Sequence, residues 1–189
     1  MKKINLLAID SGDVKSAYII YNSEKNKIIE KNILPNDEFL EAIIRAGSEN
    51  LFSEVAIEKL HSMGMAVGQT TFDTIFMNGR IYQAMRDHLN LIPTLYPRHD
   101  IKMHLCMTTR AKDGNIRMAL VNRFGDPSTK KNPHDKFNEL TDGIYFGTHF
   151  WSCLAVAMYH LEPHHSKPVI LDSYGTVQNK FEYPKGTVN

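Results

Sequence analysis

The chain has 189 residues, with 22 lysines and arginines against 21 aspartates and glutamates, a formal net charge of +1 and 42% hydrophobic residues. This length and composition predict one folded globular domain and argue against a disordered chain. Two cysteines exclude a disulfide scaffold, and no apolar run reaches the length of a membrane span, so we expect a protein of a reducing compartment.

The first part of the chain predicts three antiparallel strands. The apolar stretch Ile4–Ile9 ends at Asp10, and further strands are expected over Ser16–Tyr21 and Lys27–Leu34. Short polar turns separate the three segments, which is typical of a meander.

A helix and a fourth strand follow the meander. Asn36 is expected to cap the helix, and Gly47 is expected to end it. Glu54–Glu58 reads as a short strand that ends on a carboxylate, and residues 61–69 as a flexible loop.

A long helix is predicted over Thr71–Leu89. We expect Phe72, Ile75, Phe76, Ile81 and Met85 on its inward side. Gly79 inside this helix indicates close packing.

The rest of the chain predicts a fifth strand and three helices. The strand is expected over Ile92–Tyr96, and the helices over Asp100–Met107, Asp113–Phe124 and Thr148–Leu161. The order of elements predicts an α/β fold with a mixed sheet, in which three antiparallel strands precede βα units and helices cover both faces. We expect one domain over residues 1–162 and a tail of unassigned role over residues 163–189.

The near-zero net charge conceals an uneven distribution. Residues 96–136 carry nine basic and four acidic groups, a net charge of +5, and acidic flanks neutralise this segment. A basic segment beside acids suits a metal-dependent nuclease, because cations bind phosphates and carboxylates bind the metal. A solvated charged helix and loop is the alternative.

Two carboxylates occupy equivalent positions. Asp10 ends the first predicted strand and Glu58 ends the fourth. If these strands are neighbours, both acids emerge at one edge and form a site suited to Mg²⁺ or Mn²⁺. The alternative is that polar residues simply mark strand ends.

His149 is a third candidate, in the first turn of the last predicted helix. Thr148 is expected to cap that helix, and Ser152 lies on the same face as His149. The positive end of the helix dipole favours a neutral imidazole, which can bind a metal. A capping or packing histidine is the alternative.

Two other interpretations are weaker. His160 and His164 are four residues apart and invite a zinc site, but Pro163 lies between them, so we expect a surface role. Ala8–Gly12 is similar to the first phosphate loop of actin-like ATPases, but no second phosphate motif accompanies it.

Together, four stretches resemble the RuvC-like Holliday-junction resolvases of the ribonuclease H and retroviral-integrase superfamily, and their phage-encoded branch in particular. The stretches are Leu7–Gly12, Val55–Glu58, Arg110–Gly125 and Gly147–Ala157. The resemblance implies a ribonuclease H-like fold, hydrolysis of DNA phosphodiester bonds at junctions, and a Mg²⁺ or Mn²⁺ cofactor. It also implies a homodimer in the cytoplasm of a bacterium or a phage-infected host.

The resemblance also assigns roles to residues of this chain. Asp10 and Glu58 match the first two metal-binding acids, and His149 matches a later ligand. Ser152 stands where the family has an aspartate, and Asp142 is the nearest acid that could replace it.

DNA binding is expected from the basic segment and from the loop that follows Glu58. The residues assigned to it are Met63, Met65, Arg110, Lys112, Arg117, Arg123, Lys130 and Lys131. Two alternatives stay open: a ribonuclease H-like nuclease with another DNA or RNA substrate, and a non-catalytic nucleic-acid-binding module.

Overall fold

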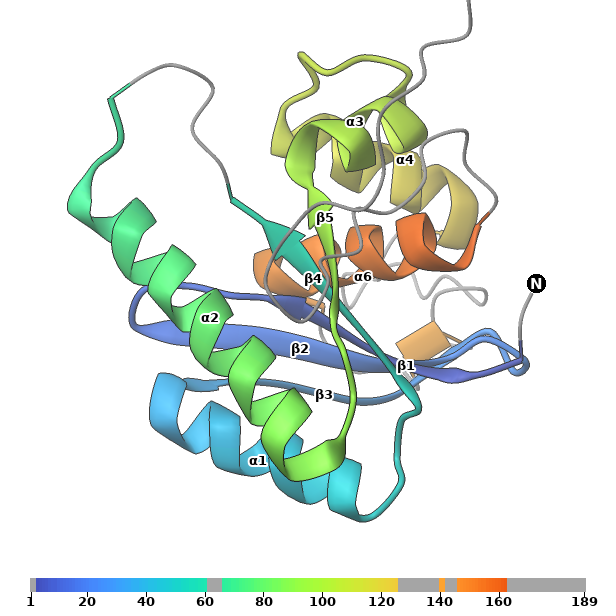
Figure 1. The fold of residues 1–189 in the computed structure, drawn as a ribbon. Helices are drawn as coiled ribbons and strands as arrows, with labels where there is room; N and C mark the ends of the chain where they lie inside the picture. Colours follow the sequence, from blue (N-terminus) through green and yellow to red (C-terminus); the bar gives the residue numbers. More distant parts are fainter. Residues whose placement is uncertain (1–2, 61–65, 126–139, 142–145, 163–189) are drawn as a thin grey trace, which may run out of the picture.

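The computed structural model describes residues 3–60, 66–125, 140–141 and 146–162. A five-stranded mixed sheet lies at its centre, in the order β3-β2-β1-β4-β5 (Figure 1). β1 pairs antiparallel with β2 and parallel with β4, so the predicted meander followed by βα units is confirmed. The strands are β1 (Asn5–Asp10), β2 (Lys15–Asn22), β3 (Lys27–Pro35), β4 (Glu54–Lys59) and β5 (Thr94–Pro97).

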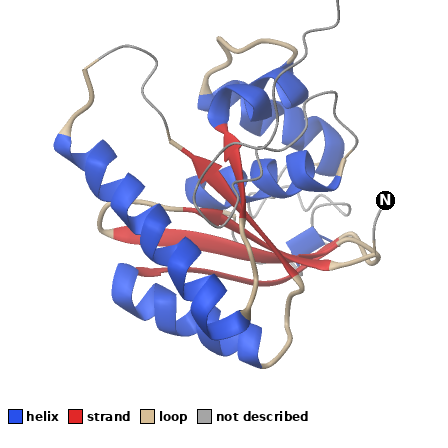
Figure 2. Cartoon of the chain, in the orientation of Figure 1, coloured by secondary structure: helices blue, strands red, loops and turns tan. Residues whose placement is uncertain are grey.

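Helices cover both faces of the sheet (Figure 2). On one face lie α1 (Asn36–Ser48) and α2 (Gln69–Leu89). On the other lie α3 (Arg98–Cys106), α4 (Asp113–Phe124) and α6 (Thr148–Leu161).

The alternation of side chains along β1 explains the two cores. Leu6 and Ala8 pack in the core formed with α6, whereas Leu7 and Ile9 pack in the core formed with α1 and α2. Successive side chains of a strand point to opposite faces, and a strand covered on both sides is apolar throughout. Asp10 continues the series of Leu6 and Ala8, so it belongs to the α6 face.

The predicted inward side of α2 is confirmed at Ile81 and Met85, which are fully buried, and is wrong in the first half of the helix. Phe72, Ile75 and Phe76 are 55%, 41% and 71% exposed. The helix instead buries the opposite side, where the polar residues Thr74 and Asn78 lie beside Met77, Ile81 and Met85. The close packing expected at Gly79 is also wrong, because a Cβ there would meet no other atom of the described residues within 4 Å.

Three smaller expectations also need correction. Pro35 and Gly147 occupy the N-cap positions, so Asn36 and Thr148 are the first residues of their helices. His160 is not a surface residue, since its side chain is 11% exposed and its two ring nitrogens contact Tyr96 and Glu54.

The described helices include none that is long and apolar enough to cross a membrane. The expected tail, residues 163–189, lies outside the described residues.

Candidate functional site

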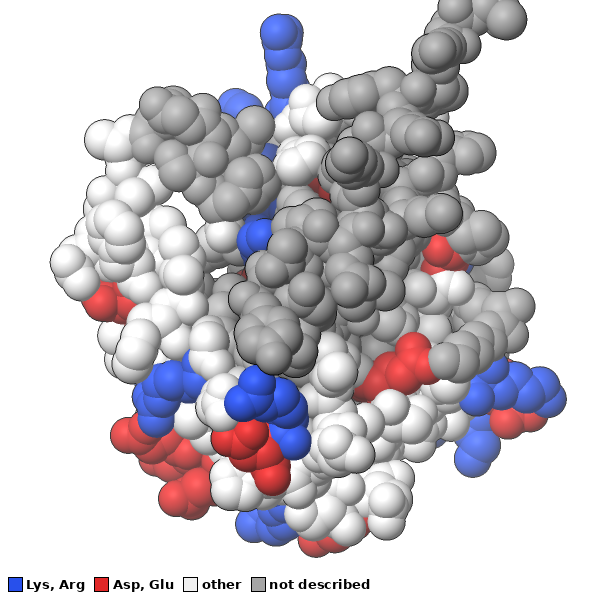
Figure 3. All heavy atoms as spheres, viewed as in Figure 1, with Lys and Arg blue, Asp and Glu red and all other residues white. Residues whose placement is uncertain are grey.

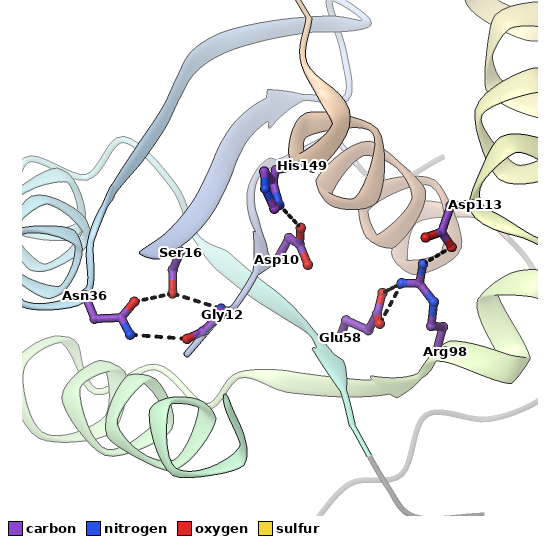
Figure 4. Close-up of polar contacts among 8 residues, drawn as sticks. All are labelled: Asp10, Gly12, Ser16, Asn36, Glu58, Arg98, Asp113 and His149. Carbon is purple, nitrogen blue, oxygen red and sulfur yellow. Dashed lines mark hydrogen bonds and ion pairs between the residues drawn. The ribbon is translucent and has the colours of Figure 1, made fainter. Parts of the chain in front are cut away.

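Asp10 and Glu58 lie side by side in register at one edge of the sheet (Figure 4). The parallel pairing of β1 with β4 runs to Ile9 opposite Ile57, and the two acids are the next residue of each strand. Both acids share the strand face that is covered by α6. Parallel pairing of two short apolar strands therefore brings together two carboxylates that are far apart in the sequence.

His149 reaches Asp10 from the first turn of α6. Its Nδ1 lies 3.0 Å from Oδ2 of Asp10. An ionised carboxylate only accepts hydrogen bonds, so a neutral imidazole that bonds to it must donate from Nδ1, which leaves the Nε2 lone pair available. The histidine side chain is 64% exposed, and that of Asp10 is 20% exposed. His149 therefore lies at the protein surface, and Asp10 lies beneath it.

Arg98, the first residue of α3, holds Glu58. Its Nη1 donates to both carboxylate oxygens of Glu58, at 2.7 and 2.6 Å, and its Nη2 contacts Asp113 at the start of α4. The Glu58 side chain is only 8% exposed. A cationic partner is therefore required to keep a charge at this depth.

Burial dominates the electrostatics of these groups. Burial raises the pKa of Asp10, against the opposing effects of His149 and Arg98. Burial raises the pKa of Glu58 as well, where Arg98 opposes the shift and the carboxylates of Asp10 and Asp113 add to it. Burial alone would lower the pKa of Arg98, but the carboxylates of Glu58 and Asp113 raise it by more than burial lowers it. The net pKa is raised, so Arg98 stays a cation. The acids therefore form a cluster whose ionised form is stabilised by positive charge.

A network of hydrogen bonds shapes the loop that follows Asp10 (Figure 4). The Asn36 amide donates to the Gly12 carbonyl at 3.2 Å and accepts from the Ser16 hydroxyl at 2.8 Å, and Ser16 accepts from the Gly12 N–H at 3.3 Å. A Cβ at Gly12 would lie 2.3 Å from the Lys15 carbonyl oxygen, so only glycine fits this turn. The loop beside the first acid is thus held in one conformation.

Cys153 lies one turn after His149 in α6. It is fully buried, and burial together with the nearby charge of Asp10 raises its thiol pKa well above the ordinary value. It therefore acts as a neutral packing residue.

The basic residues expected to bind DNA are exposed where the structure describes them. Lys112 precedes α4, and Arg117 lies on it with its guanidinium 5.8 Å from the Trp151 ring in the first turn of α6. Arg110 lies in the loop before α4, and Arg123 near its end pairs with Glu162. Four residues assigned to DNA binding and one assigned to the metal lie outside the described residues: Met63, Met65, Lys130, Lys131 and Asp142.

A divalent cation fits this site by the type of its donors. Carboxylate oxygens of Asp10 and Glu58 suit Mg²⁺ or Mn²⁺, and the imidazole of His149 suits Mn²⁺. As the side chains stand, no three His, Cys, Asp or Glu residues in the described part of the chain are grouped closely enough to hold a metal. Arg98 instead supplies positive charge to Glu58, and a cation bound there would have to share Glu58 with it or displace it.

Sequence reasoning missed Arg98 and Asp113 as members of the site. Both were counted only as charges of the basic segment. The usable signal is that Arg98 directly follows β5, since ligands of α/β proteins gather beyond the carboxyl ends of parallel strands. The expected helix start at Asp100 hid this position.

Comparison with known structures identifies the fold. RuvC from Thermus thermophilus aligns with a TM-score of 0.53 and 14% identity, over 82% of this chain and 92% of that chain. RuvC of the same organism in complex with a Holliday junction substrate aligns with a TM-score of 0.55 and 15% identity, over 83% and 92%. No family model and no curated protein matches the chain. The chain thus has a RuvC-like, ribonuclease H-like α/β fold, as the resemblance implied.

Proposed function

We propose that the chain is a metal-dependent endonuclease of the phage-type RuvC branch that cuts branched DNA, with four-way junctions as its substrate. The observation that carries this proposal is that Asp10 and Glu58 end neighbouring parallel strands of a RuvC-like fold, with His149 in contact with Asp10. The similar RuvC structure in complex with a Holliday junction supports this substrate class.

The side chains of the site divide the chemistry between them. Asp10 and Glu58 would hold Mg²⁺ or Mn²⁺, which supplies an activated water and stabilises charge on the scissile phosphate. His149 would either add a nitrogen ligand or accept a proton at Nε2, because its Nδ1 faces Asp10. Arg98 limits the repulsion between Glu58 and its acidic neighbours before the cation binds.

DNA would approach across α4 and the first turn of α6. Lys112 is exposed just before α4 and Arg117 is exposed on it, and Arg117 lies close to Trp151, two residues after His149. Phosphate contacts there would set the position of the strand relative to the acids without reading its sequence.

Symmetric cutting of a junction requires two active sites, which a homodimer supplies. The first half of α2 presents an apolar surface, formed by Phe72, Ile75 and Phe76, and Figure 3 shows mostly uncharged side chains over it. Ile75 and Phe76 line a groove together with Leu40 and Gly79. We assign this α2 apolar surface to contact with a second copy of the chain.

We place the protein in the cytoplasm, where its DNA substrate lies. Cys106 and Cys153 are both free thiols, as a reducing compartment requires.

A non-catalytic DNA-binding module is the second candidate. Ser152 stands where the resolvases have an acid, and Arg98 already neutralises Glu58. Both observations favour a site that binds DNA without cutting it.

Cleavage of matched substrates separates these functions. A four-way junction and a linear duplex with the same arm sequences are incubated with the wild type and with Asp10→Asn in Mg²⁺. We expect the wild type to nick only the junction, and Asp10→Asn to bind it without cutting. Binding without cutting by the wild type would favour the non-catalytic module, and equal cutting of the duplex would favour another ribonuclease H-like nuclease.

A further inference from the structure

Asn78 is a buried amide in the middle of α2 that connects the two strand ends of the site. Its Oδ1 accepts a hydrogen bond from the hydroxyl of Ser11, at 2.5 Å, and its Nδ2 donates to the main-chain oxygen of Glu58, at 3.2 Å. Ser11 directly follows Asp10. The Asn78 side chain thus binds both the backbone of Glu58 and the residue that follows Asp10.

An asparagine in this position requires a specific reason. Asparagine is a poor helix former, and a buried amide is unfavourable unless it is hydrogen-bonded. Asn78 is 8% exposed. Thr74, one turn earlier and 7% exposed, bonds within its own helix, to the Thr70 carbonyl at 2.8 Å, and its side chain has no other hydrogen-bond partner among the described residues. Asn78 therefore differs from Thr74 in directing its polar atoms at the site.

The position of Asn78 complements the sheet. The recorded pairing of β1 with β4 ends at Ile9 opposite Ile57, one residue before the acids. Beyond that point, the hydrogen bonds from Ser11 to Asn78 and from Asn78 to Glu58 connect the two strands. These bonds fix the separation of the strand ends at the level of the carboxylates.

We propose that Asn78 is a positioning residue that sets the spacing of Asp10 and Glu58 and thereby the affinity of this pair for a divalent cation. The inference rests on the proposed function, because it assumes that the two acids hold a metal. Magnesium tolerates little departure from ideal octahedral geometry, so a small change in spacing weakens its binding. Loss of a residue that supports metal ligands typically weakens metal affinity by about 10- to 100-fold.

The test measures Mn²⁺ binding by calorimetry on the full chain without DNA. Asn78→Leu removes both hydrogen bonds and preserves the approximate size of the side chain. Thr74→Val is the matched control on the same helix, since it removes a buried hydrogen bond that does not reach the site. We expect Asn78→Leu to raise the half-saturating Mn²⁺ concentration at least about tenfold, and Thr74→Val to leave it unchanged.

Ser11→Ala tests the same connection from outside the core. It removes the donor to Asn78 without altering helix packing, so it carries the test if Asn78→Leu does not fold. We expect weaker Mn²⁺ binding for Ser11→Ala, and no additional loss when it is combined with Asn78→Leu, because both changes break one connection.

Asp10→Asn distinguishes failure of this inference from failure of the proposed function. If Asp10→Asn loses Mn²⁺ binding while Asn78→Leu and Ser11→Ala bind like the wild type, the positioning role is overturned and the metal site stands. Equal weakening by Asn78→Leu and Thr74→Val would also overturn it. If Asp10→Asn binds Mn²⁺ like the wild type, the proposed metal site is wrong, and the positioning role of Asn78 is then wrong as well.

Discussion

Arg98 donates two hydrogen bonds through a single nitrogen to the buried carboxylate of Glu58. The guanidinium lies at the sheet edge where a divalent cation is proposed to bind, and it also contacts Asp113. Arg98 therefore balances the acids of the metal-free protein. A cation bound there would compete with Arg98 for the same negative charge.

Arg98→Met is predicted to make the protein depend on metal for stability. The change leaves Glu58 buried without its ion-pair partner, which costs about 3–5 kcal/mol in fully buried pairs and less here, because Arg98 is 28% exposed. Differential scanning fluorimetry should show a lower Tm in EDTA and a larger rise in Tm with Mn²⁺ than in the wild type. Lys3→Met, which breaks an exposed pair with Glu24, should change neither value. Equal Mn²⁺ shifts for Arg98→Met and the wild type would contradict the competition.

Asp10→Asn is predicted to stabilise the metal-free protein at neutral pH. Burial raises the folded-state pKa of Asp10 above its ordinary value of 3.8, so the folded chain holds this proton more tightly than the unfolded chain. Stability therefore falls as the pH rises from that value through the raised pKa, and above it the full penalty is present. Removing the charge abolishes the penalty.

The measurement is Tm against pH in EDTA. The Tm of Asp10→Asn should exceed that of the wild type at pH values above the raised pKa of Asp10. The difference in Tm should vanish as the pH falls to the ordinary pKa of an aspartate. Asp13→Asn, at an exposed acid in the next loop, is the control and should track the wild type. A lower Tm for Asp10→Asn at neutral pH would refute the electrostatic account of the site.

Phe76→Asp is predicted to convert a dimer to a monomer. Phe76 is 71% exposed on the α2 apolar surface, so a charge there opposes association without disturbing the core. Light scattering after size exclusion reports the mass. Met118→Asp, at a 58% exposed methionine on α4, should remain dimeric. A monomeric wild type would remove the proposed interface.

Replacing Lys112 and Arg117 by alanine is predicted to weaken junction binding and its salt dependence. Each lost phosphate contact lowers the slope of log affinity against log salt concentration by about 0.9. Fluorescence anisotropy at several salt concentrations measures this slope. Lys3→Ala at the start of the chain is the control. An unchanged slope in the double variant would show that α4 does not face DNA.

The strand pattern was sufficient to predict that Asp10 and Glu58 each end a strand, but not that the two strands are neighbours or what surrounds the acids. Alternation within each strand depends only on local sequence, whereas the parallel pairing of β1 with β4, which brings Asp10 and Glu58 together, is long-range. The contact of Arg98 with Glu58 depends on β5 lying beside β4, a long-range pairing that the sequence of either strand does not specify.

The error on α2 has a similar cause. In the first half of α2, Phe72, Ile75 and Phe76 form the more apolar stripe, and helical periodicity therefore selects them as the core-facing side. The structure buries the stripe that contains Thr74 and Asn78. Periodicity cannot distinguish a stripe that faces the sheet from one that is exposed, or recognise that a buried Asn78 has partners at two strand ends.

The most direct test of the account is the position of Mn²⁺ in crystals of the wild-type protein, read from anomalous scattering. The account predicts a peak in contact with the carboxylates of Asp10 and Glu58 and close to His149, with Arg98 withdrawn from at least one oxygen of Glu58, and no such peak in Asp10→Asn. Absence of a peak there at saturating Mn²⁺, with Arg98 still donating to both oxygens of Glu58, would contradict it.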